Sequence, residues 1–428
     1  MTRRTFTAAS YTAIAGANDR IGLGYIGLGA RGDRLHEIAL GANTRTVAVC
    51  DLMPAYLDLA VSKAGNAPVR LHDHRSILDR KDVDAVVIAT PDHWHALMFL
   101  DACRAGKDVY IEKPMSLTVA EGSRMVEASK GRVVQVGTQR RSSPMIREAA
   151  AFVRGGGIGR VTMARAFDNL NEWPAGIGRA ADEPPPPGFD WDRWLGPAPK
   201  RPYNRNRTWY NYRWFYDYSC GQVTNNGIHL LDIVRWSLGL GAPKKIAAMG
   251  GRYAIDDGRE IPDTLEVMWE FDGPVLATFA QLNANEAPSN AQGADLELRG
   301  TRGTLYLHND RIEIVPERTS AGPRYRISPL NRPANRAAWM SARKPAMEPR
   351  ILKGNALADH EHVRNFLECV RSREKCNAPP EEGHISTSTC ILASIAARTG
   401  AMLTWDGRTT GVPAADRLLD YEYRRPPG

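Results

Sequence analysis

The chain has 428 residues, of which 43% are hydrophobic and 24% charged, and its formal net charge is +8 at neutral pH. This length predicts about two or three domains and excludes a small module that depends on disulfides for its core. No uncharged apolar run reaches the roughly 18 to 20 residues that a membrane-spanning helix needs, so we expect no membrane span. No block of like charges is present, which argues against nucleic acid as a partner.

The first 19 residues form a leader-like segment that we set apart from the fold. Arg3 and Arg4 precede a short run of small and apolar residues, a pattern typical of a twin-arginine export signal. Because polar residues interrupt the run, a vestigial leader is the alternative. We expect a periplasmic protein if the leader is functional and a cytoplasmic one otherwise.

Residues 20–140 alternate short β-branched runs with helical patterns. Such alternation predicts right-handed crossover units on a parallel sheet, which is the doubly wound Rossmann architecture. The predicted strands are 21–26, 45–51, 85–89, 108–111 and 133–136, and the predicted helices include 54–64, 93–105 and 119–130.

Residues 141–428 predict a second α/β domain in which successive strands have short connections. Short connections between successive strands are typical of a mostly antiparallel sheet. We expect residues 316–352, which are polar, Arg-rich and interrupted by prolines, to form a long loop or wrapping arm. The predicted strands are 161–168, 244–252, 264–271, 275–282, 294–299 and 304–307, and the predicted helices are 143–154, 227–238, 360–371 and 386–399.

The first predicted strand leads into a glycine-rich turn. Gly27, Gly29 and Gly32 form a G-x-G-x-x-G motif, and a helix leaves the turn from Ala30 and Arg31. Backbone N–H groups at the start of such a helix face the pyrophosphate of a dinucleotide. A tight strand-to-helix turn without a ligand is the alternative.

Asp51 follows the second predicted strand, 24 residues after Gly27. A carboxylate there accepts hydrogen bonds from ribose hydroxyls and repels a 2′-phosphate, so the sequence favours NAD over NADP. Other candidates follow the third and fourth strands, whose carboxyl ends lie on the same rim of the sheet. These cofactor-binding candidates are Thr90, Pro91, His95, Glu112 and Lys113.

The Glu112-Lys113-Pro114 turn and a downstream Gly-x-His-x-x-Asp segment, which runs from Gly227 to Asp232, complete an ordered set of motifs. With the glycine turn and Asp51, this set resembles the Gfo/Idh/MocA family of oxidoreductases, and most closely its exported bacterial subgroup. The resemblance implies a Rossmann domain followed by an α/β domain whose large open sheet covers the substrate and mediates homo-oligomerisation, as a dimer or tetramer. It also implies hydride exchange between NAD(P) and a ring carbon of a sugar or cyclitol.

The resemblance further implies which side chains carry the proton chemistry. The family's lysine, histidine and aspartate correspond here to Lys113, His229 and Asn225. Asn225 departs from the pattern, because an amide orients a hydroxyl but cannot accept its proton. Proton transfer would therefore fall to His229 with Lys113.

Further residues are candidates for contacting the substrate. Seven aromatic residues lie between Trp209 and Tyr218 and are suited to stack on sugar rings, although core packing or a subunit interface explains them equally well. The basic pair Arg140-Arg141 either meets an acidic or phosphorylated group or is solvated. We expect no metal, because the spaced histidine pairs lack further ligands. The substrate-binding candidates are His93, Arg140, Tyr212, Trp214, Asn225 and Asn226.

The sequence thus predicts an NAD-dependent oxidoreductase that acts on a secondary alcohol of a sugar, sugar derivative or cyclitol. One alternative is a redox-assisted glycosidase, in which transient oxidation is followed by elimination, hydration and reduction. A second alternative is a dinucleotide-binding protein without catalytic activity.

Overall fold

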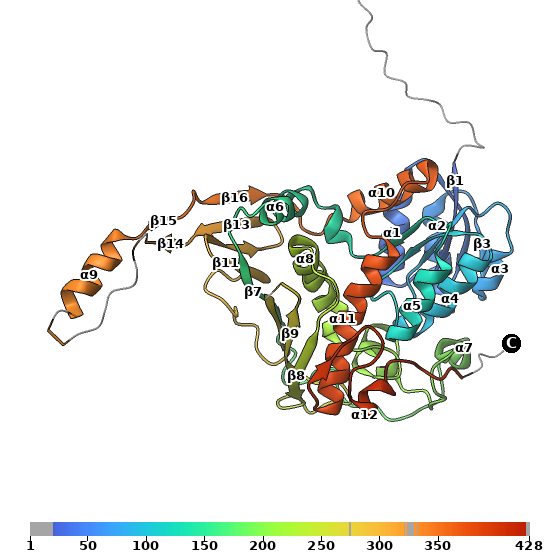
Figure 1. The fold of residues 1–428 in the computed structure, drawn as a ribbon. Helices are drawn as coiled ribbons and strands as arrows, with labels where there is room; N and C mark the ends of the chain where they lie inside the picture. Colours follow the sequence, from blue (N-terminus) through green and yellow to red (C-terminus); the bar gives the residue numbers. More distant parts are fainter. Residues whose placement is uncertain (1–19, 274, 321, 323–328, 331, 425–428) are drawn as a thin grey trace, which may run out of the picture.

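The computed structural model describes residues 20–424 except 274, 321, 323–328 and 331 (Figure 1). The leader-like segment, with Arg3 and Arg4, lies outside the described residues. The described chain forms two α/β domains, each built on its own large sheet. No helix of this described part is long and apolar enough to cross a bilayer.

The first domain contains a six-stranded, all-parallel sheet in the order β3-β2-β1-β4-β5-β6, which confirms the predicted doubly wound architecture. The strand order reverses between β1 and β4, and ligands of such sheets bind at the carboxyl ends beside this point. The strands are β1 (Ile21–Ile26), β2 (Thr44–Cys50), β3 (Val69–Leu71), β4 (Ala85–Ile88), β5 (Asp108–Ile111) and β6 (Val134–Val136). The helices are α1 (Ala30–Ala39), α2 (Pro54–Ala64), α3 (His74–Leu78), α4 (Asp92–Arg104) and α5 (Val119–Ala128).

The second domain contains a nine-stranded sheet in the order β16-β13-β12-β11-β7-β10-β9-β8-β17. Only β7 and β10 pair in parallel within it, so the predicted mostly antiparallel sheet is confirmed. Its strands are β7 (Val161–Asn169), β8 (Lys245–Gly251), β9 (Thr264–Phe271), β10 (Val275–Leu282), β11 (Leu296–Gly300), β12 (Gly303–Leu307), β13 (Arg311–Pro316), β16 (Arg350–Lys353) and β17 (Leu403–Thr404).

Helices cover one face of this second sheet, where α6 (Pro144–Arg154), α8 (Ile228–Leu238) and α11 (Pro380–Thr399) share its apolar core. Along β9 the buried residues alternate with exposed ones, as expected of a strand with one face in the core. The opposite face is uncovered and carries exposed apolar side chains, among them Met249, Met268, Leu276, Val315 and Ile351.

A C-terminal helix returns to the first domain. Val363, Phe366 and Leu367 of α10 (Asp359–Ser372) pack into the same apolar cluster as Leu23 of β1. This helix therefore also brings C-terminal side chains close to the rim of the parallel sheet.

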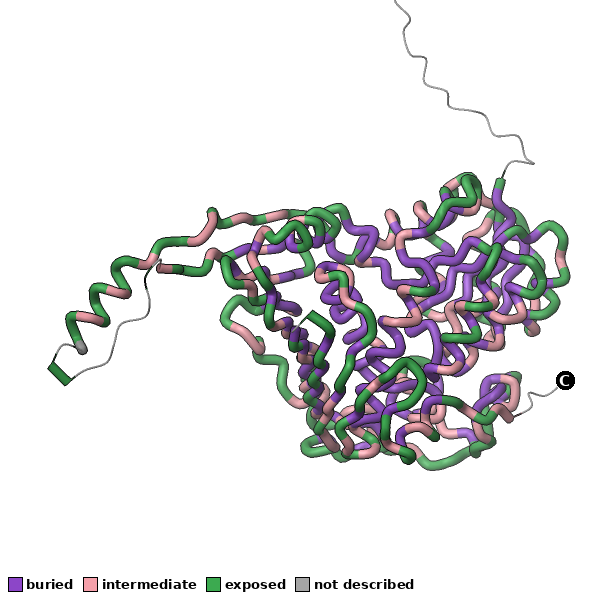
Figure 2. Tube along the Cα trace, in the orientation of Figure 1, coloured by how far each residue is buried: buried purple, intermediate pink, exposed green. Residues whose placement is uncertain are grey.

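The predicted arm at 316–352 contains more regular structure than a loop. It carries β14 (Arg318–Thr319), α9 (Arg332–Ala342) and β15 (Lys344–Pro345), and it projects from the body with little burial (Figures 1 and 2). Pro333 lies in the first turn of α9, where proline is tolerated, and the alanines that follow are strong helix formers. The segment is therefore an arm, as one of the two predicted alternatives states, but it contains a helix that was not predicted.

Candidate active site

The glycine turn has the geometry of a phosphate-binding loop. Gly27 adopts a φ of +85°, and a Cβ on Gly32 would lie 1.9 Å from the main-chain oxygen of Gly27. Glycine is therefore required at both positions. The helix α1 then begins at Ala30, and no side chain caps its first N–H groups. These N–H groups and the helix dipole suit an anion such as a pyrophosphate.

The Asp51 carboxylate is fixed beside this turn. Its Oδ2 accepts a hydrogen bond from the Leu28 N–H at 2.7 Å, and its Oδ1 accepts one from the Met53 N–H at 2.9 Å. Burial raises the pKa of Asp51 above its ordinary value. Each oxygen keeps a lone pair for a further donor, as two adjacent ribose hydroxyls would supply.

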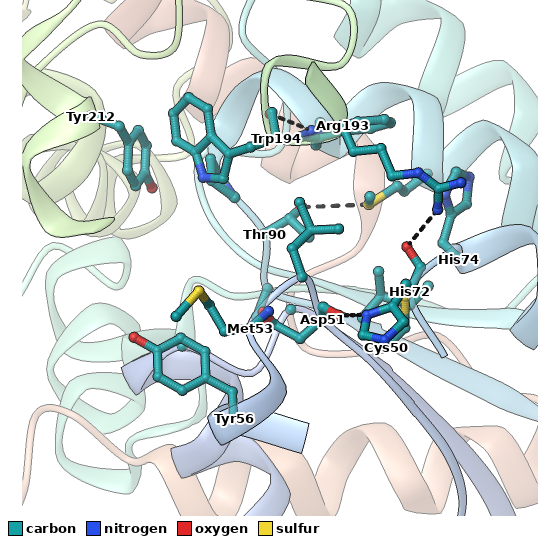
Figure 3. Close-up of a pocket in the computed structure, with 18 of the residues that line it drawn as sticks. Cys50, Asp51, Met53, Tyr56, His72, His74, Thr90, Arg193, Trp194 and Tyr212 are labelled. Atoms are coloured by element: carbon teal, nitrogen blue, oxygen red, sulfur yellow. Dashed lines mark hydrogen bonds between the residues drawn. The ribbon is translucent and has the colours of Figure 1, made fainter. Parts of the chain in front are cut away.

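A crevice of about 610 Å³ lies along the rim of the parallel sheet and is called here the cofactor crevice (Figure 3). The first domain lines it with predicted cofactor residues, and the turn, the uncapped helix and the carboxylate together fit a dinucleotide. The second domain adds lining residues that the sequence did not single out, such as Arg193 and Trp194. The predicted residues that line the crevice are Gly27, Gly29, Ala30, Arg31, Asp51, Thr90, Pro91 and Tyr212.

Lys113 follows β5 and reaches across the domain junction. Its Nζ donates hydrogen bonds to the main-chain oxygen and the Oδ1 of Asn225, both at 2.8 Å. Burial lowers the pKa of Lys113 to about 8, the nearby Arg213 adding to this effect while Glu112 opposes it. An amine with such a pKa can exchange a proton near neutral pH.

The Glu112 carboxylate is held by Arg31 and by the main chain of the turn. Its Oε1 accepts a hydrogen bond from Arg31 Nε at 2.7 Å, and its Oε2 accepts one from the Lys113 N–H at 3.2 Å. Arg31 also pairs with Asp359 of α10 at 2.9 Å. The glutamate thus orders the turn, and the arginine links the glycine turn to it.

His229 lies in the first turn of α8, directly after a π-helical turn, Val223–Gly227, that contains Asn225 and Asn226. Such π turns occur frequently at functional sites. Burial, reinforced by the positive charges of Lys113 and Arg140, lowers the pKa of His229 well below its ordinary value. The imidazole is therefore neutral at pH 7, and its buried Nδ1 has no hydrogen-bond partner among the described residues.

A polar pair joins the π-helical turn to β7. Asn226 Nδ2 donates to Asp168 Oδ1 at 3.1 Å, while the buried Oδ2 of Asp168 has no partner in the described structure. Burial raises the pKa of Asp168 to about 6. The sequence analysis missed Asp168, although it stands at the end of a predicted strand with an alternating pattern.

The adjacent Arg140 and Arg141 differ in their hydrogen-bond and ion-pair partners. Arg140 has a buried Nε and Nη1 without partners among the described residues, and it acts electrostatically on His229. Arg141 is buried and paired with Asp232 at 2.7 Å and Glu382 at 3.1 Å. The solvated alternative for this pair is therefore wrong for Arg141.

Several predicted site residues do not line the crevice, among them Lys113, Asn225 and His229. Three others are buried in the surrounding structure. His95 is buried, with its ring nitrogens 2.7 Å from Pro114 O and 2.9 Å from Thr90 O. His93 is buried with its Nε2 3.0 Å from Trp194 O. Trp214 is fully buried in an aromatic cluster, with a guanidinium 4.2 Å from its ring. Neither His93 nor Trp214 lines the cofactor crevice, and their substrate-binding roles stay predictions.

Comparisons with known proteins match both domains of the chain. Residues 21–139 match the oxidoreductase family's NAD-binding Rossmann fold, and residues 158–249 match its C-terminal alpha/beta domain. The inositol 2-dehydrogenase of Acidothermus cellulolyticus is 37% identical over 305 residues, which cover 69% of this chain and 75% of that relative. The chain belongs to the Gfo/Idh/MocA oxidoreductase family. The predicted family and its NAD-binding domain are thereby confirmed.

Solved structures share the fold at low sequence identity. Scyllo-inositol dehydrogenase from Lactobacillus casei, solved with NAD(H) and scyllo-inositol, is 19% identical with a TM-score of 0.61, over 90% of this chain and 99% of that one. A levoglucosan dehydrogenase, solved in complex with NADH and levoglucosan, is 19% identical with a TM-score of 0.64, and the match again covers 90% of this chain and 99% of that one. A glycosyl hydrolase family 109 protein of Shewanella baltica is 32% identical over 126 residues, so the chain spans 28% of that relative.

Proposed function

We propose that the protein is an NAD-dependent dehydrogenase of a secondary alcohol on a sugar, sugar derivative or cyclitol. The observation that carries this proposal is the partly buried Lys113 amino group, which has a lowered pKa and donates hydrogen bonds to Asn225 at the junction of the two domains. Similarity to an inositol 2-dehydrogenase, and a fold shared with scyllo-inositol and levoglucosan dehydrogenases, support the substrate class.

The cofactor would be held by the glycine turn, the start of α1 and Asp51, and when bound it supplies the hydride acceptor. Two hydrogens of the Lys113 ammonium are engaged by Asn225, which leaves the third direction for a substrate hydroxyl. The neutral amine accepts the hydroxyl proton as the carbon loses its hydride. The unpartnered His229 Nδ1 is available to the same oxygen or its neighbour, and Asp168 and Arg140 to more distant hydroxyls.

Reduction of added NAD by a panel of inositols and anhydrosugars tests this proposal. We expect turnover with at least one of them, and a rate lower by about 10²-fold or more in Lys113→Met. Wild-type protein that binds NAD but oxidises none of the panel would favour the non-catalytic alternative. Unchanged turnover in Lys113→Met would contradict the role given to the amine.

Similarity to glycosyl hydrolase family 109 proteins keeps the redox-assisted glycosidase as a second candidate. The distinguishing experiment offers a nitrophenyl glycoside without added NAD. Phenol release over many turnovers, with no net accumulation of reduced nicotinamide, would favour the glycosidase over the dehydrogenase.

We also infer that the protein forms a homo-oligomer, a dimer or tetramer, through the uncovered face of the second sheet. Its exposed apolar side chains, such as Met268 and Ile351, form the kind of surface that a second copy buries. Light scattering after size exclusion measures the mass. We expect Met268→Glu to lower the mass, whereas a monomeric wild type would exclude the proposal.

The localisation proposal rests on the leader-like segment alone. We propose export to the periplasm through Arg3 and Arg4. Cell fractionation should find the wild type in the periplasm and the double variant Arg3→Lys, Arg4→Lys in the cytoplasm. Equal distribution of both forms would indicate a vestigial leader.

A further inference from the structure

The arm, residues 316–352, continues the hairpin of β13 and β16 beyond the edge of the second sheet (Figure 1). Its stem is the antiparallel pair of β14 and β15, and α9 lies between these two strands in the sequence. Met347 at the base of the arm packs against the apolar core of the second domain. One end of the arm is therefore fixed in the domain, while α9 stands away from it.

Two arginines of the stem hold α9 in place. Arg343 Nε donates a hydrogen bond to the main-chain oxygen of Arg318 at 2.9 Å, and Arg318 Nη2 donates one to the main-chain oxygen of Arg343 at 2.8 Å. Arg343 also pairs with Glu317 at 3.2 Å, and its guanidinium lies 4.9 Å from the centre of the Trp339 ring. One side chain thus connects both strands of the stem to the last turn of the helix.

The helix α9 is exposed although most of its residues are apolar. None of its described side chains is buried (Figure 2). Arg336, Ala337 and Met340 are exposed and lie on one face, because they are spaced by three or four residues. Asn335 and Trp339 are half-buried on the opposite face. A helix of 11 residues is only marginally stable without packing, so the exposed face is suited to contact another molecule.

The uncovered face of the second sheet offers a surface of matching chemistry. Met249 of β8 and Met268 of β9 are both exposed. Glu266 lies two residues before Met268 and opposite Met249 in the antiparallel pair, so the three side chains share this face. Glu266 is also exposed and makes no hydrogen bond or ion pair with any residue that the structure describes. The face therefore carries an unpaired carboxylate between two methionines.

Arg336 is the corresponding cation on α9. It has no hydrogen-bond or ion-pair partner in the described part of the chain. A guanidinium beside Ala337 and Met340 complements a carboxylate beside two methionines, because opposite charges attract and the apolar groups leave water together. Figure 1 shows α9 at the far end of the arm, away from β9, so a single chain does not bring the two surfaces into contact.

A second copy of this chain is the occupant that the position of the arm favours. The arm extends from β13 and β16, whose exposed Val315 and Ile351 belong to the uncovered face that a second copy would bury. A lipid surface would instead need large apolar side chains on the exposed side of the helix. That side of α9 offers only alanine and methionine beside its arginine.

We propose that the arm of each subunit docks on the uncovered sheet face of a second copy, with Arg336 paired to Glu266 of the partner subunit. The inference rests on the proposed homo-oligomer and assigns a contact that holds it together. In a dimer with two-fold symmetry the exchange is reciprocal, so each dimer contains the contact twice.

Reversing one charge tests this contact. Arg336→Glu and Glu266→Arg each place like charges opposite one another in both contacts of a homodimer. We expect each variant to have a dissociation constant at least about tenfold higher than the wild type, measured by analytical ultracentrifugation over a range of concentrations. Arg364→Glu is the matched control, because it reverses an exposed arginine of α10 and should leave the dissociation constant unchanged.

Mixing the two variants distinguishes a contact between copies from one within a chain. In a mixed dimer the reversed arm of one subunit meets the reversed sheet face of the other, and the unchanged arm meets the unchanged face. Both contacts are then attractive, so the mixture should recover the dissociation constant of the wild type. A mixture that associates as weakly as its separate components would overturn the inference.

The remaining outcomes separate this inference from the proposed oligomer. An oligomeric wild type whose dissociation constant is unchanged in Arg336→Glu would overturn the arm contact and leave the sheet-face oligomer intact. A monomeric wild type would overturn both. Binding to phosphatidylglycerol vesicles by the wild type and not by Arg336→Glu, with equal mass of the two proteins, would assign the arm to a membrane surface instead.

Discussion

Lys113 Nζ donates hydrogen bonds to two oxygens of one residue, the main-chain oxygen and the Oδ1 of Asn225, each at 2.8 Å. The family resemblance implies an aspartate at the position that Asn225 holds here. A neutral amide orients the amine equally well but adds no negative charge to stabilise its protonated form. Burial therefore dominates, and the pKa of Lys113 falls from its ordinary value to about 8.

The first prediction concerns the pH dependence of alcohol oxidation. Because neutral Lys113 accepts the proton, kcat/KM should rise with pH through a midpoint near 8 and then level off. His229 should add no titration between pH 6 and about 7, since its pKa lies well below its ordinary value of 6.5. Steady-state rates with NAD in excess across this range provide the measurement. A profile that falls with rising pH would contradict the assignment.

Asn225→Asp restores a carboxylate beside the amine. The added negative charge should raise the pKa of Lys113, so the midpoint of the oxidation profile should move to higher pH. Asn225→Ala is the control, because it removes the side-chain acceptor without adding charge. If the Asp variant keeps the wild-type midpoint, the amide does not set the pKa of the lysine.

Lys113→Met should alter stability in a pH-dependent way. The folded-state pKa of Lys113 is about 8 and the ordinary value 10.5, so the buried charge costs stability fully below pH 8 and progressively less up to about 10.5. The melting temperature of the variant minus that of the wild type should therefore be largest at pH 7 and smaller at pH 10. A melting-temperature difference that grows with pH would contradict the lowered pKa of Lys113 in the folded protein.

Asp51→Asn should weaken discrimination between the two nicotinamide nucleotides. The amide oxygen still accepts a hydrogen bond from a loop N–H group, but the negative charge that repels a 2′-phosphate is lost. We expect affinity for NAD to fall about tenfold and the preference for NAD over NADP to shrink. Calorimetric titration with both nucleotides measures this, and Asp58→Asn, which alters an exposed carboxylate of α2, is the control. An unchanged preference would remove Asp51 from nucleotide selection.

Arg141→Met should destabilise the fold without acting on the cofactor. It leaves the buried Asp232 carboxylate without its main partner, which costs about 3–5 kcal/mol. Denaturant unfolding measures the loss. The double variant with Asp232→Leu should recover part of it, and Arg70→Met, which breaks an exposed pair, should cost less than about 1 kcal/mol. A double variant less stable than the single one would contradict the account.

The parts that the sequence predicted well are those in which periodicity and turn chemistry agree. The strand at 21–26 and the helix at 54–64 match β1 and α2 at both ends. The edge strand β3 was missed, because its three residues are too few to show an alternating pattern and two of them are exposed. The cofactor rim was predictable because strand ends of one parallel sheet meet at one edge.

The residues with which the second domain lines the crevice were not predictable from local patterns. The aromatic run between Trp209 and Tyr218 gave no signal to separate Tyr212, which lines the crevice, from Trp214, which is buried. Asp168 and Asn226 meet across 58 positions of sequence, and Arg424 and Asp192 across 232. Such pairings depend on tertiary packing, which local patterns do not encode.

The pairing of Asp192 with Arg424 also has a consequence for protein synthesis. Asp192 is translated more than two hundred residues before the arginine that pairs with it. This part of the crevice wall therefore gains the pairing only after most of both domains has been made.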